Sequence, residues 1–292
     1  MELQQLRTFV SIVENRSFTK ASQALHLSQP AVTRQILGLE QELGATLLER
    51  RIRRVAVTPA GEVLEGYANR ILSMVRDCRA SVSQMQQGGA GRISVATSGT
   101  AATYLLPPLL ARLRALHPRI DLTVFTGGSQ EAAQMVLDER VDLGVVMYFH
   151  AHRDLKATVG GSYRLVAAVS PAHSLAGRRT VSVNELIEQP LIVMQKGANL
   201  RAEVDNLFAS KRAAPRVTIE VDHVEAMKKM AEATLGVAIV PDVAVEAGEL
   251  WVLPIRGAAF TQRRWSAIHR RNRTLTTAMR AFLEVLLAKQ KS

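Results

Sequence analysis

The chain has 292 residues, of which 47% are hydrophobic and 22% charged, and its formal net charge is +11. This length allows two domains, and the composition is that of a folded protein and not of a disordered one. The first residues lack the basic and apolar regions of a secretory signal peptide, and no stretch has the length and apolarity of a membrane span. The single cysteine, Cys78, excludes an internal disulfide and fits a reducing compartment, so we expect a cytoplasmic protein.

The positive charge suits a polyanionic partner, but its distribution does not locate that partner. Residues 1–91 hold 11 Lys and Arg against 8 Asp and Glu, a net charge of +3, whereas the remaining residues hold 26 against 18, a net charge of +8. A DNA site in the N-terminal part must therefore be argued from the local arrangement of its residues.

Residues 1–58 show helical periodicity with short interruptions. Apolar residues recur on one face over residues 3–13, and a second short helix is indicated over residues 18–25. Ser28 is a good N-cap for a third helix, which we expect to end near Gly44. The segments TLLER, RIRR and VAVT then predict a two-stranded hairpin with an arginine-rich tip.

The second and third helices predict a helix-turn-helix, in which the start of the second of the pair reaches base edges in the major groove. Gln29 can pair with adenine and Arg34 with guanine, while Ser28 at the helix N-terminus suits a phosphate. The alternative is a plain helical hairpin with a solvated polar face, but the arginine hairpin that follows favours a DNA-contacting wing. The predicted DNA-binding residues are Ser28, Gln29, Pro30, Thr33, Arg34, Arg50, Arg53 and Arg54.

Residues 59–91 predict a linker helix and a hinge. Apolar residues recur at steps of three and four, as in a coiled coil, at Leu64, Tyr67, Ile71, Met74, Cys78, Val82 and Met85. Pairing of two copies is the simplest way to bury this seam, and the alternative is one core helix inside a monomer. Cys78 is expected to be packed and not reactive, and the sequence GGAG at 88–91 ends the helix.

Residues 92–292 alternate strand-like and helical segments, which predicts an α/β domain with mainly parallel strands. The number of strands requires two sheets, and so two subdomains: subdomain I over about 92–162 and 266–292, and subdomain II over about 163–265. Ligands of open α/β sheets bind beyond the carboxyl ends of the strands. The alternative is that the polar residues found there only cap turns and helices. The predicted effector-binding residues are Ser98, Gly99, Thr100, Gly128, Ser129, Gln195, Lys196, Asn199 and His223.

These residues carry a resemblance to the LysR-type transcriptional regulators. Residues 1–51 match the N-terminal signature of that family almost position by position, and VAVTPAG matches the strand that leads into its linker helix. The effector-domain blocks are matched by ISVATSGTAATYLLPPLLARLRALHP, RVDLGVVM and LGVAIVP. The resemblance covers essentially the whole chain.

The resemblance implies an all-α winged helix-turn-helix, a long linker helix and a two-subdomain α/β effector domain similar to periplasmic binding proteins. It also implies double-stranded DNA and a small-molecule effector as partners, dimers that pair into tetramers, and RNA polymerase as a candidate partner. Three positions depart from the family pattern. Leu48 stands where phenylalanine is usual, Thr33 where serine is common, and Thr234, which we expect near the ligand cleft, where glycine often occurs.

Enzymatic signals are absent from the sequence, so we expect no catalytic residue, no metal and no cofactor. The histidines lack metal-ligand spacing, and no phosphate-binding or dinucleotide-binding glycine motif occurs. The alternative function is a solute-binding or enzymatic α/β protein with a helical extension. We favour a small carboxylate or phosphate as effector, held by helix N-termini, with Lys196 and Arg201 as countercharges.

Overall fold

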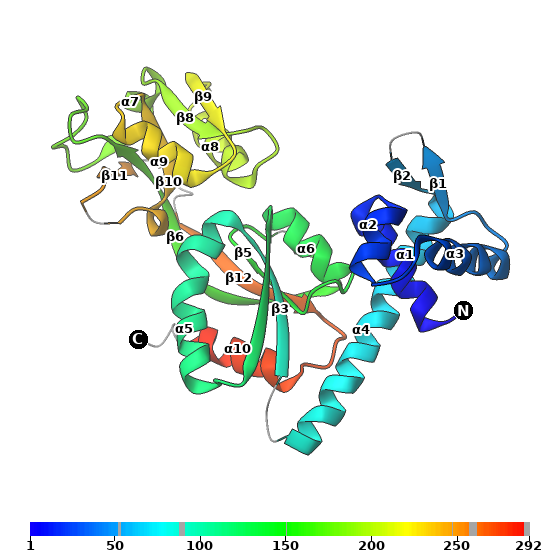
Figure 1. The fold of residues 1–292 in the computed structure, drawn as a ribbon. Helices are drawn as coiled ribbons and strands as arrows, with labels where there is room; N and C mark the ends of the chain where they lie inside the picture. Colours follow the sequence, from blue (N-terminus) through cyan, green and yellow to red (C-terminus); the bar gives the residue numbers. More distant parts are fainter. Residues whose placement is uncertain (52–53, 88–90, 150, 247, 257–261, 289–292) are drawn as a thin grey trace. The chain divides into compact units, whose positions relative to one another are not determined.

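The computed structural model describes residues 1–292 apart from 52–53, 88–90, 150, 247, 257–261 and 289–292 (Figure 1). The chain divides into two compact units. The first comprises residues 1–89 with 138–140, and the second comprises 90–137 with 141–292. Within the described part of the chain, no helix is long and apolar enough to cross a membrane. Each unit is described here by itself.

The first unit opens with the predicted three helices and hairpin. They are α1 (Leu3–Asn15), α2 (Phe18–Ala24), α3 (Gln29–Leu43) and the antiparallel strands β1 (Leu48–Arg51) and β2 (Arg54–Val57). Ser28 caps α3 by accepting a hydrogen bond from the backbone N–H of Ala31 over 3.3 Å, and Gly44 ends the helix at φ +63°. One apolar core joins these elements, and at its centre Phe9 and Leu39 are fully buried.

Helix α4 (Pro59–Gln87) begins where the motif VTPAG places it. The Thr58 hydroxyl accepts a hydrogen bond from the N–H of Gly61 over 3.0 Å and donates one to the carbonyl of Thr46 over 2.7 Å. A Cβ atom on Gly61 would lie 2.3 Å from the carbonyl oxygen of Leu47, so the helix can approach the hairpin only with glycine there. The motif therefore sets where the helix starts and how closely it packs.

The predicted seam of α4 is divided between two environments. Leu64 is buried in the core of the first unit, so it does not belong to a free surface. Tyr67, Met74 and Val82 are instead exposed by 56%, 68% and 53%. Cys78, which was expected to be packed, is also exposed in the single chain. Ile71 is half-buried and packs against the same core as Leu64. The seam is therefore shared between the core of the first unit and the exposed surface of the helix. Of the expected hinge, Gly88 to Ala90 lie outside the described residues.

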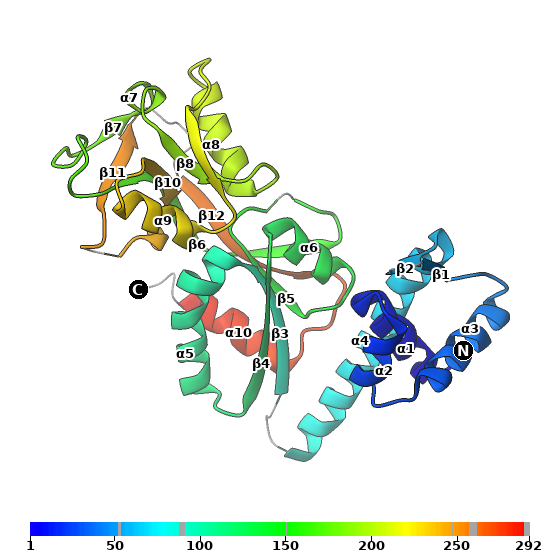
Figure 2. The same cartoon turned by 45° about the horizontal axis from the view of Figure 1, so that its top comes forward.

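Subdomain I of the second unit has three neighbouring parallel strands with helices on both faces. Its elements are β3 (Gly91–Ser98), η1 (Ala101–Leu105), α5 (Leu106–Leu116), β4 (Ile120–Gly127), α6 (Ser129–Leu137), β5 (Leu143–Val146) and α10 (Thr277–Ala288). The strand order is β4-β3-β5. Figure 2 shows α5 and α10 together on one face and α6 on the other.

Subdomain II repeats this arrangement. Its elements are β7 (Val181–Ser182), α7 (Val183–Ile187), β8 (Leu191–Met194), α8 (Asn199–Ala209), β9 (Val217–Val221), α9 (Val224–Glu232), β10 (Val237–Pro241), η2 (Asp242–Ala244) and β11 (Trp251–Arg256). Strands β10, β8 and β9 are parallel neighbours. The chain therefore brings the carboxyl ends of β8 and β9 to one edge, as β3 and β4 do in subdomain I.

Two long strands join the subdomains, where the sequence predicted separate sheets. Strand β6 (Leu155–Val169) pairs with β12 (Gln262–Arg270) over residues 155–164 and with β10 and β11 over residues 165–169. All of these strands thus belong to one connected sheet. A Cβ atom on Gly160 would lie 2.1 Å from the ring of Trp265, so the crossing strands pack too closely for any side chain there.

The turn that follows β3 is wider than an α-helix. Residues Ala101–Leu105 form a π-helical turn, η1, ahead of α5. Pro107 and Pro108 have no N–H to donate to the carbonyls of residues 103 and 104, which removes the α-helical bonds that this turn would otherwise make. The two prolines therefore determine how the side chains of η1, Tyr104 among them, are presented.

Candidate DNA interface and effector cleft

The first two turns of α3 present the predicted DNA-contacting residues on one side. Ser28, Gln29, Pro30 and Arg34 are exposed, and Thr33 is half-buried. The opposite side of the helix is closed, because Val32 and Ile36 are buried in the core of the first unit. The dipole and the open N–H groups at this exposed N-terminus favour a phosphate, with the side chains that can read bases one turn further along.

The hairpin is fastened to this helix by an interaction that the sequence analysis missed. The Glu40 carboxylate of α3 accepts hydrogen bonds from the backbone N–H groups of Leu47 and Leu48, over 2.7 and 3.2 Å. Arg50 and Arg54 lie on the paired strands β1 and β2, while Arg53 lies outside the described residues. Glu40 stands eight residues before β1, and this spacing indicates a contact only once the end of α3 has been folded against the strand.

All nine predicted effector-binding residues line one cavity of about 890 Å³ between the two subdomains. They come from the ends of four strands. Ser98 ends β3 and is followed by Gly99 and Thr100, Gly128 and Ser129 follow β4, Gln195, Lys196 and Asn199 follow β8, and His223 follows β9. Parallel strands whose carboxyl ends face a common crevice bring these separate sequence segments together.

The cavity also has lining residues that the sequence analysis did not select. Among them are Tyr104, Tyr148, Tyr163 and Glu203. Two of these carry a signal in the sequence, because Tyr104 stands four residues after Thr100 and Glu203 four residues after Asn199, the spacing of neighbours on a helix. The tyrosines at 148 and 163 follow or lie within strands and carry no such signal.

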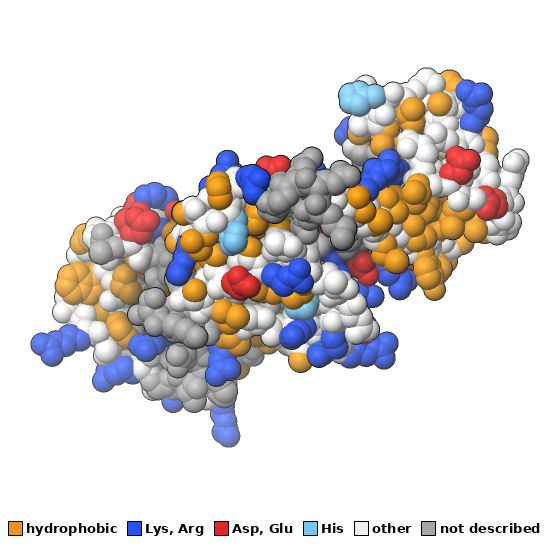
Figure 3. Space-filling view, turned by 90° about the horizontal axis from the view of Figure 1, so that it is seen from below, with side chains coloured by type: hydrophobic (Ala, Val, Ile, Leu, Met, Phe, Trp, Pro, Cys, Tyr) orange, Lys and Arg blue, Asp and Glu red, His pale blue; other side chains and the backbone are white. Residues whose placement is uncertain are grey.

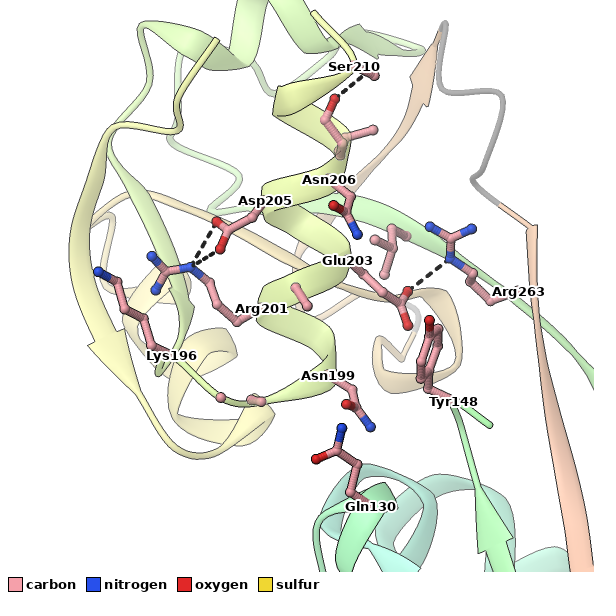
Figure 4. A pocket seen from close by; sticks show the side chains of 15 residues that line it. Gln130, Tyr148, Lys196, Asn199, Arg201, Glu203, Asp205, Asn206, Ser210 and Arg263 are labelled. Atoms are coloured by element: carbon pink, nitrogen blue, oxygen red, sulfur yellow. Dashed lines mark hydrogen bonds and ion pairs between the residues drawn. The ribbon is translucent and has the colours of Figure 1, made fainter. Parts of the chain in front are cut away.

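A second hollow of about 570 Å³ continues from the first around α8. Its wall contains Glu203, only 4% exposed, whose carboxylate accepts a hydrogen bond from the Tyr163 hydroxyl over 3.0 Å and pairs with Arg263 over 3.1 Å. Burial raises the pKa of Glu203, and the bonds from Tyr163 and Arg263 oppose that shift. Figure 4 shows Gln130 and Asn199 facing each other where the two hollows meet.

Two family models match the chain. The model described as LysR substrate binding domain matches residues 86–291, and the model described as bacterial regulatory helix-turn-helix protein, lysR family, matches residues 3–62. The chain belongs to the LysR family. It is therefore a DNA-binding transcriptional regulator with an effector-binding domain, and the proteins to which it is similar are regulators and not enzymes.

Individual LysR-family proteins match over most of their length. The regulator BenM of Acinetobacter baylyi is 31% identical over 82% of this chain and 80% of its own. The RuBisCO operon transcriptional regulator of Allochromatium vinosum is 28% identical over 99% of this chain and 96% of its own. The crystal structure of full-length CbnR complexed with its target DNA covers 99% of both chains at 26% identity, with a TM-score of 0.73.

Arg201 does not supply the countercharge expected of it in this LysR-family cleft. It is 7% exposed, and its guanidinium pairs with Asp205 over 2.9 Å and with Glu220 over 2.6 Å, and also donates to the carbonyl of Met194. Figure 4 shows Arg201 and Asp205 on the side of α8 away from Glu203. Asp205, four residues along the same helix, and Glu220 on β9 already neutralise the charge of Arg201, so it is not available to a ligand.

The N-terminus of α6 is also less open than expected. The Glu131 carboxylate lies 3.4 Å from the N–H of Gly128 and would contact a Cβ atom placed on Gly127, so it occupies the place where an anion would approach. Helix α8, by contrast, has no acidic residue in its first turn and no side-chain cap. The N-terminus of α8 is therefore open to an anion, whereas the Glu131 carboxylate occupies that of α6.

The departures from the LysR-family pattern have separate consequences. Leu48 is buried in the core of the first unit, where an apolar side chain is required. Thr234 was expected near the cleft, but it does not line the cavity, because it lies in the turn before β10 and the cavity lies beyond the opposite, carboxyl ends of the strands. Its φ of +61° is the left-handed conformation that favours glycine.

Proposed function

We propose that this regulator binds DNA as a dimer and responds to a small carboxylate or phosphate held in the 890 Å³ cavity. The observation that carries the proposal is the convergence of four strand ends, from both subdomains, on that cavity. A ligand that contacts both subdomains can shift the equilibrium between their relative arrangements. The size of that shift is set by how much more tightly the ligand binds one arrangement than the other.

The anionic part of the effector is proposed to lie at the start of α8. That helix N-terminus carries the positive end of the dipole, is free of acidic residues in its first turn, and follows Lys196, which is exposed in the cavity wall. Each such helix end favours an anion by about 0.3–1 kcal/mol, more where the site is partly buried. Thr100, across the cavity, offers a hydroxyl to the same ligand.

Calorimetry on the full chain with three probes tests the effector class: succinate, inorganic phosphate and, as a neutral comparison, glycerol. We expect heat from at least one of the two anions and none from glycerol. Lys196→Gln should weaken anion binding, and Thr100→Val, which keeps the shape of the side chain, should abolish the response of DNA binding to the anion. Binding of glycerol with no heat from either anion would overturn the anionic effector.

Dimerisation is proposed to use the exposed apolar residues of α4. Tyr67, Met74 and Val82 follow one another along this helix and are exposed in the single chain. Figure 3 shows a group of apolar side chains on one face of the N-terminal unit, at the right of the view. Exposed apolar side chains in a row along one helix favour an interaction surface, and pairing with a second α4 is the simplest way to bury them. Family membership extends the proposal to tetramers, to contact with RNA polymerase and to action in the cytoplasm.

The alternative function is a solute-binding or enzymatic α/β protein with a helical extension. We favour regulation because the relatives that match the chain are transcriptional regulators. Within the residues that the structure describes, no three His, Cys, Asp or Glu side chains are grouped so that they could hold a metal ion.

A further inference from the structure

A buried lysine lies beside the cavity without lining it. Lys228 of α9 is 2% exposed, and its ammonium has three partners. It pairs with Glu249 over 2.9 Å and with Glu225 over 3.3 Å, and it donates a hydrogen bond to the hydroxyl oxygen of Tyr104 over 2.9 Å. Burial lowers the pKa of Lys228, but its pairing with the carboxylates of Glu249 and Glu225 outweighs that effect, so the pKa is raised and the ammonium stays charged.

The third of these partners belongs to the other subdomain. Tyr104 lies on η1, directly after the first strand of subdomain I, whereas Lys228 lies on the last helix before β10 in subdomain II. The Tyr104 side chain packs against the subdomain II core that contains Met227 and Val240. One residue thus has its backbone in one subdomain and its side chain anchored in the other.

The Tyr104 hydroxyl can still donate a hydrogen bond. Its oxygen accepts the hydrogen bond from Lys228, and among the described residues the structure gives its own proton no acceptor. Tyr104 lines the cavity one helical turn beyond Thr100. A hydroxyl whose oxygen accepts a hydrogen bond from a cation becomes a better donor, because the bonds polarise one another. An oxygen acceptor in the cavity is the partner that this group lacks.

We propose that Tyr104 is the residue that recognises the effector and couples it to the arrangement of the two subdomains. Its hydroxyl donates to a carboxylate or phosphate oxygen of the ligand while its oxygen remains bound to Lys228. The ligand therefore completes a chain of hydrogen bonds that runs from the cavity into α9. This inference rests on the proposed function of the cavity, and it adds to that proposal the residue that senses occupancy.

A ligand-independent experiment tests the coupling. Spin labels at Arg112→Cys on α5 and Ala209→Cys on α8, both exposed positions, report the distance between the subdomains in a Cys78→Ser background. Labelled chains are diluted with unlabelled chains, so that only pairs within one chain are measured. Tyr104→Phe keeps the ring and removes the hydroxyl, and we expect the distance distribution to broaden or shift.

The matched control is Thr103→Val. Thr103 lines the same cavity on the same turn, but its hydroxyl donates to the carbonyl of Gly99 within subdomain I, over 3.0 Å. We expect this variant to leave the distance distribution unchanged. An identical distribution for Tyr104→Phe and the unaltered chain would overturn the coupling.

Calorimetry tests the recognition, with succinate and inorganic phosphate as the probes. Tyr104→Phe should lower the affinity for the bound anion by about tenfold or more, as expected for loss of a hydrogen bond to a charged group, while Thr103→Val should stay close to the unaltered chain. Equal affinities for Tyr104→Phe and the unaltered chain would overturn Tyr104 as the recognition residue. If the unaltered chain binds neither anion, the anionic effector and its recognition by Tyr104 both fail, and the spin-label distances alone decide the coupling.

Discussion

The hydroxyl of Thr8 in α1 donates a hydrogen bond to the side-chain oxygen of Gln35 in α3. Thr8 is fully buried, so water does not compete for this bond, and it ties the rotation of α3 about its axis to α1. Gln35 adjoins Arg34, which lies on the exposed side of the same helix. The recognition helix is therefore held with Arg34 facing outward before it meets DNA.

Arg34→Ala should weaken binding to the specific site by about 1–3 kcal/mol, because a bidentate contact to guanine is lost. Fluorescence anisotropy with labelled DNA from upstream of the protein's own coding region, and with a random duplex of the same length, measures the two affinities. Binding to the random duplex should change much less. Arg112→Ala, which removes an exposed arginine from α5, is the control for charge alone. Equal losses on both duplexes would show that Arg34 contacts the phosphate backbone and not a base.

Met74→Glu should dissociate the dimer. Met74 is 68% exposed in the single chain, so the substitution leaves the fold of one chain intact, while in a paired α4 it buries an unpaired charge. Sedimentation velocity measures the change in mass, and DNA affinity should fall because a single winged helix-turn-helix spans one half-site. Leu43→Glu, at another exposed apolar position of the first unit, is the control. An intact Met74→Glu dimer would place the interface elsewhere.

Thr234→Gly should stabilise the second unit by up to about 1 kcal/mol. The left-handed backbone costs a residue with a Cβ roughly 1–2 kcal/mol, and the greater freedom of glycine in the unfolded chain offsets part of the gain. Thr234→Ala keeps the Cβ and should gain little. Urea unfolding followed by the fluorescence of Trp251 and Trp265 measures both variants. A stability gain for Thr234→Ala as large as that for Thr234→Gly would contradict the backbone explanation.

Acid should destabilise the second unit through His269. This side chain is 3% exposed, and burial lowers its pKa below the ordinary value of 6.5. The unfolded chain therefore takes up a proton before the folded chain does, so the free energy of unfolding decreases as the pH falls from 6.5 towards the lower pKa of the folded state. Unfolding between pH 7.5 and 5 should show a shallower loss in His269→Gln than in the unaltered chain. The exposed His223→Gln variant should follow the unaltered chain, and the idea fails if His269→Gln does so too.

Local sequence rules determined the N-terminal elements. The apolar period of α1 and α3, the capping by Ser28 and the left-handed Gly44 act within a few residues of one another, so they can be derived without knowing the rest of the fold. The positions of the cleft residues at the ends of the strands can also be derived from the sequence alone. A polar residue directly after a buried parallel strand lies at the ligand edge of the sheet whatever the connections elsewhere.

Only the tertiary structure decided which charges in the cleft remain available. Lys196 and Arg201 look alike in sequence, but Arg201 is compensated by Glu220 from another strand, nineteen residues away along the chain. The pairing of Tyr104 with Lys228 joins positions 124 residues apart. The first pair depends on how α8 packs on β9, and the second on how β6 and β12 cross between the subdomains; long-range strand pairing leaves no periodic signal in the segments that it brings together.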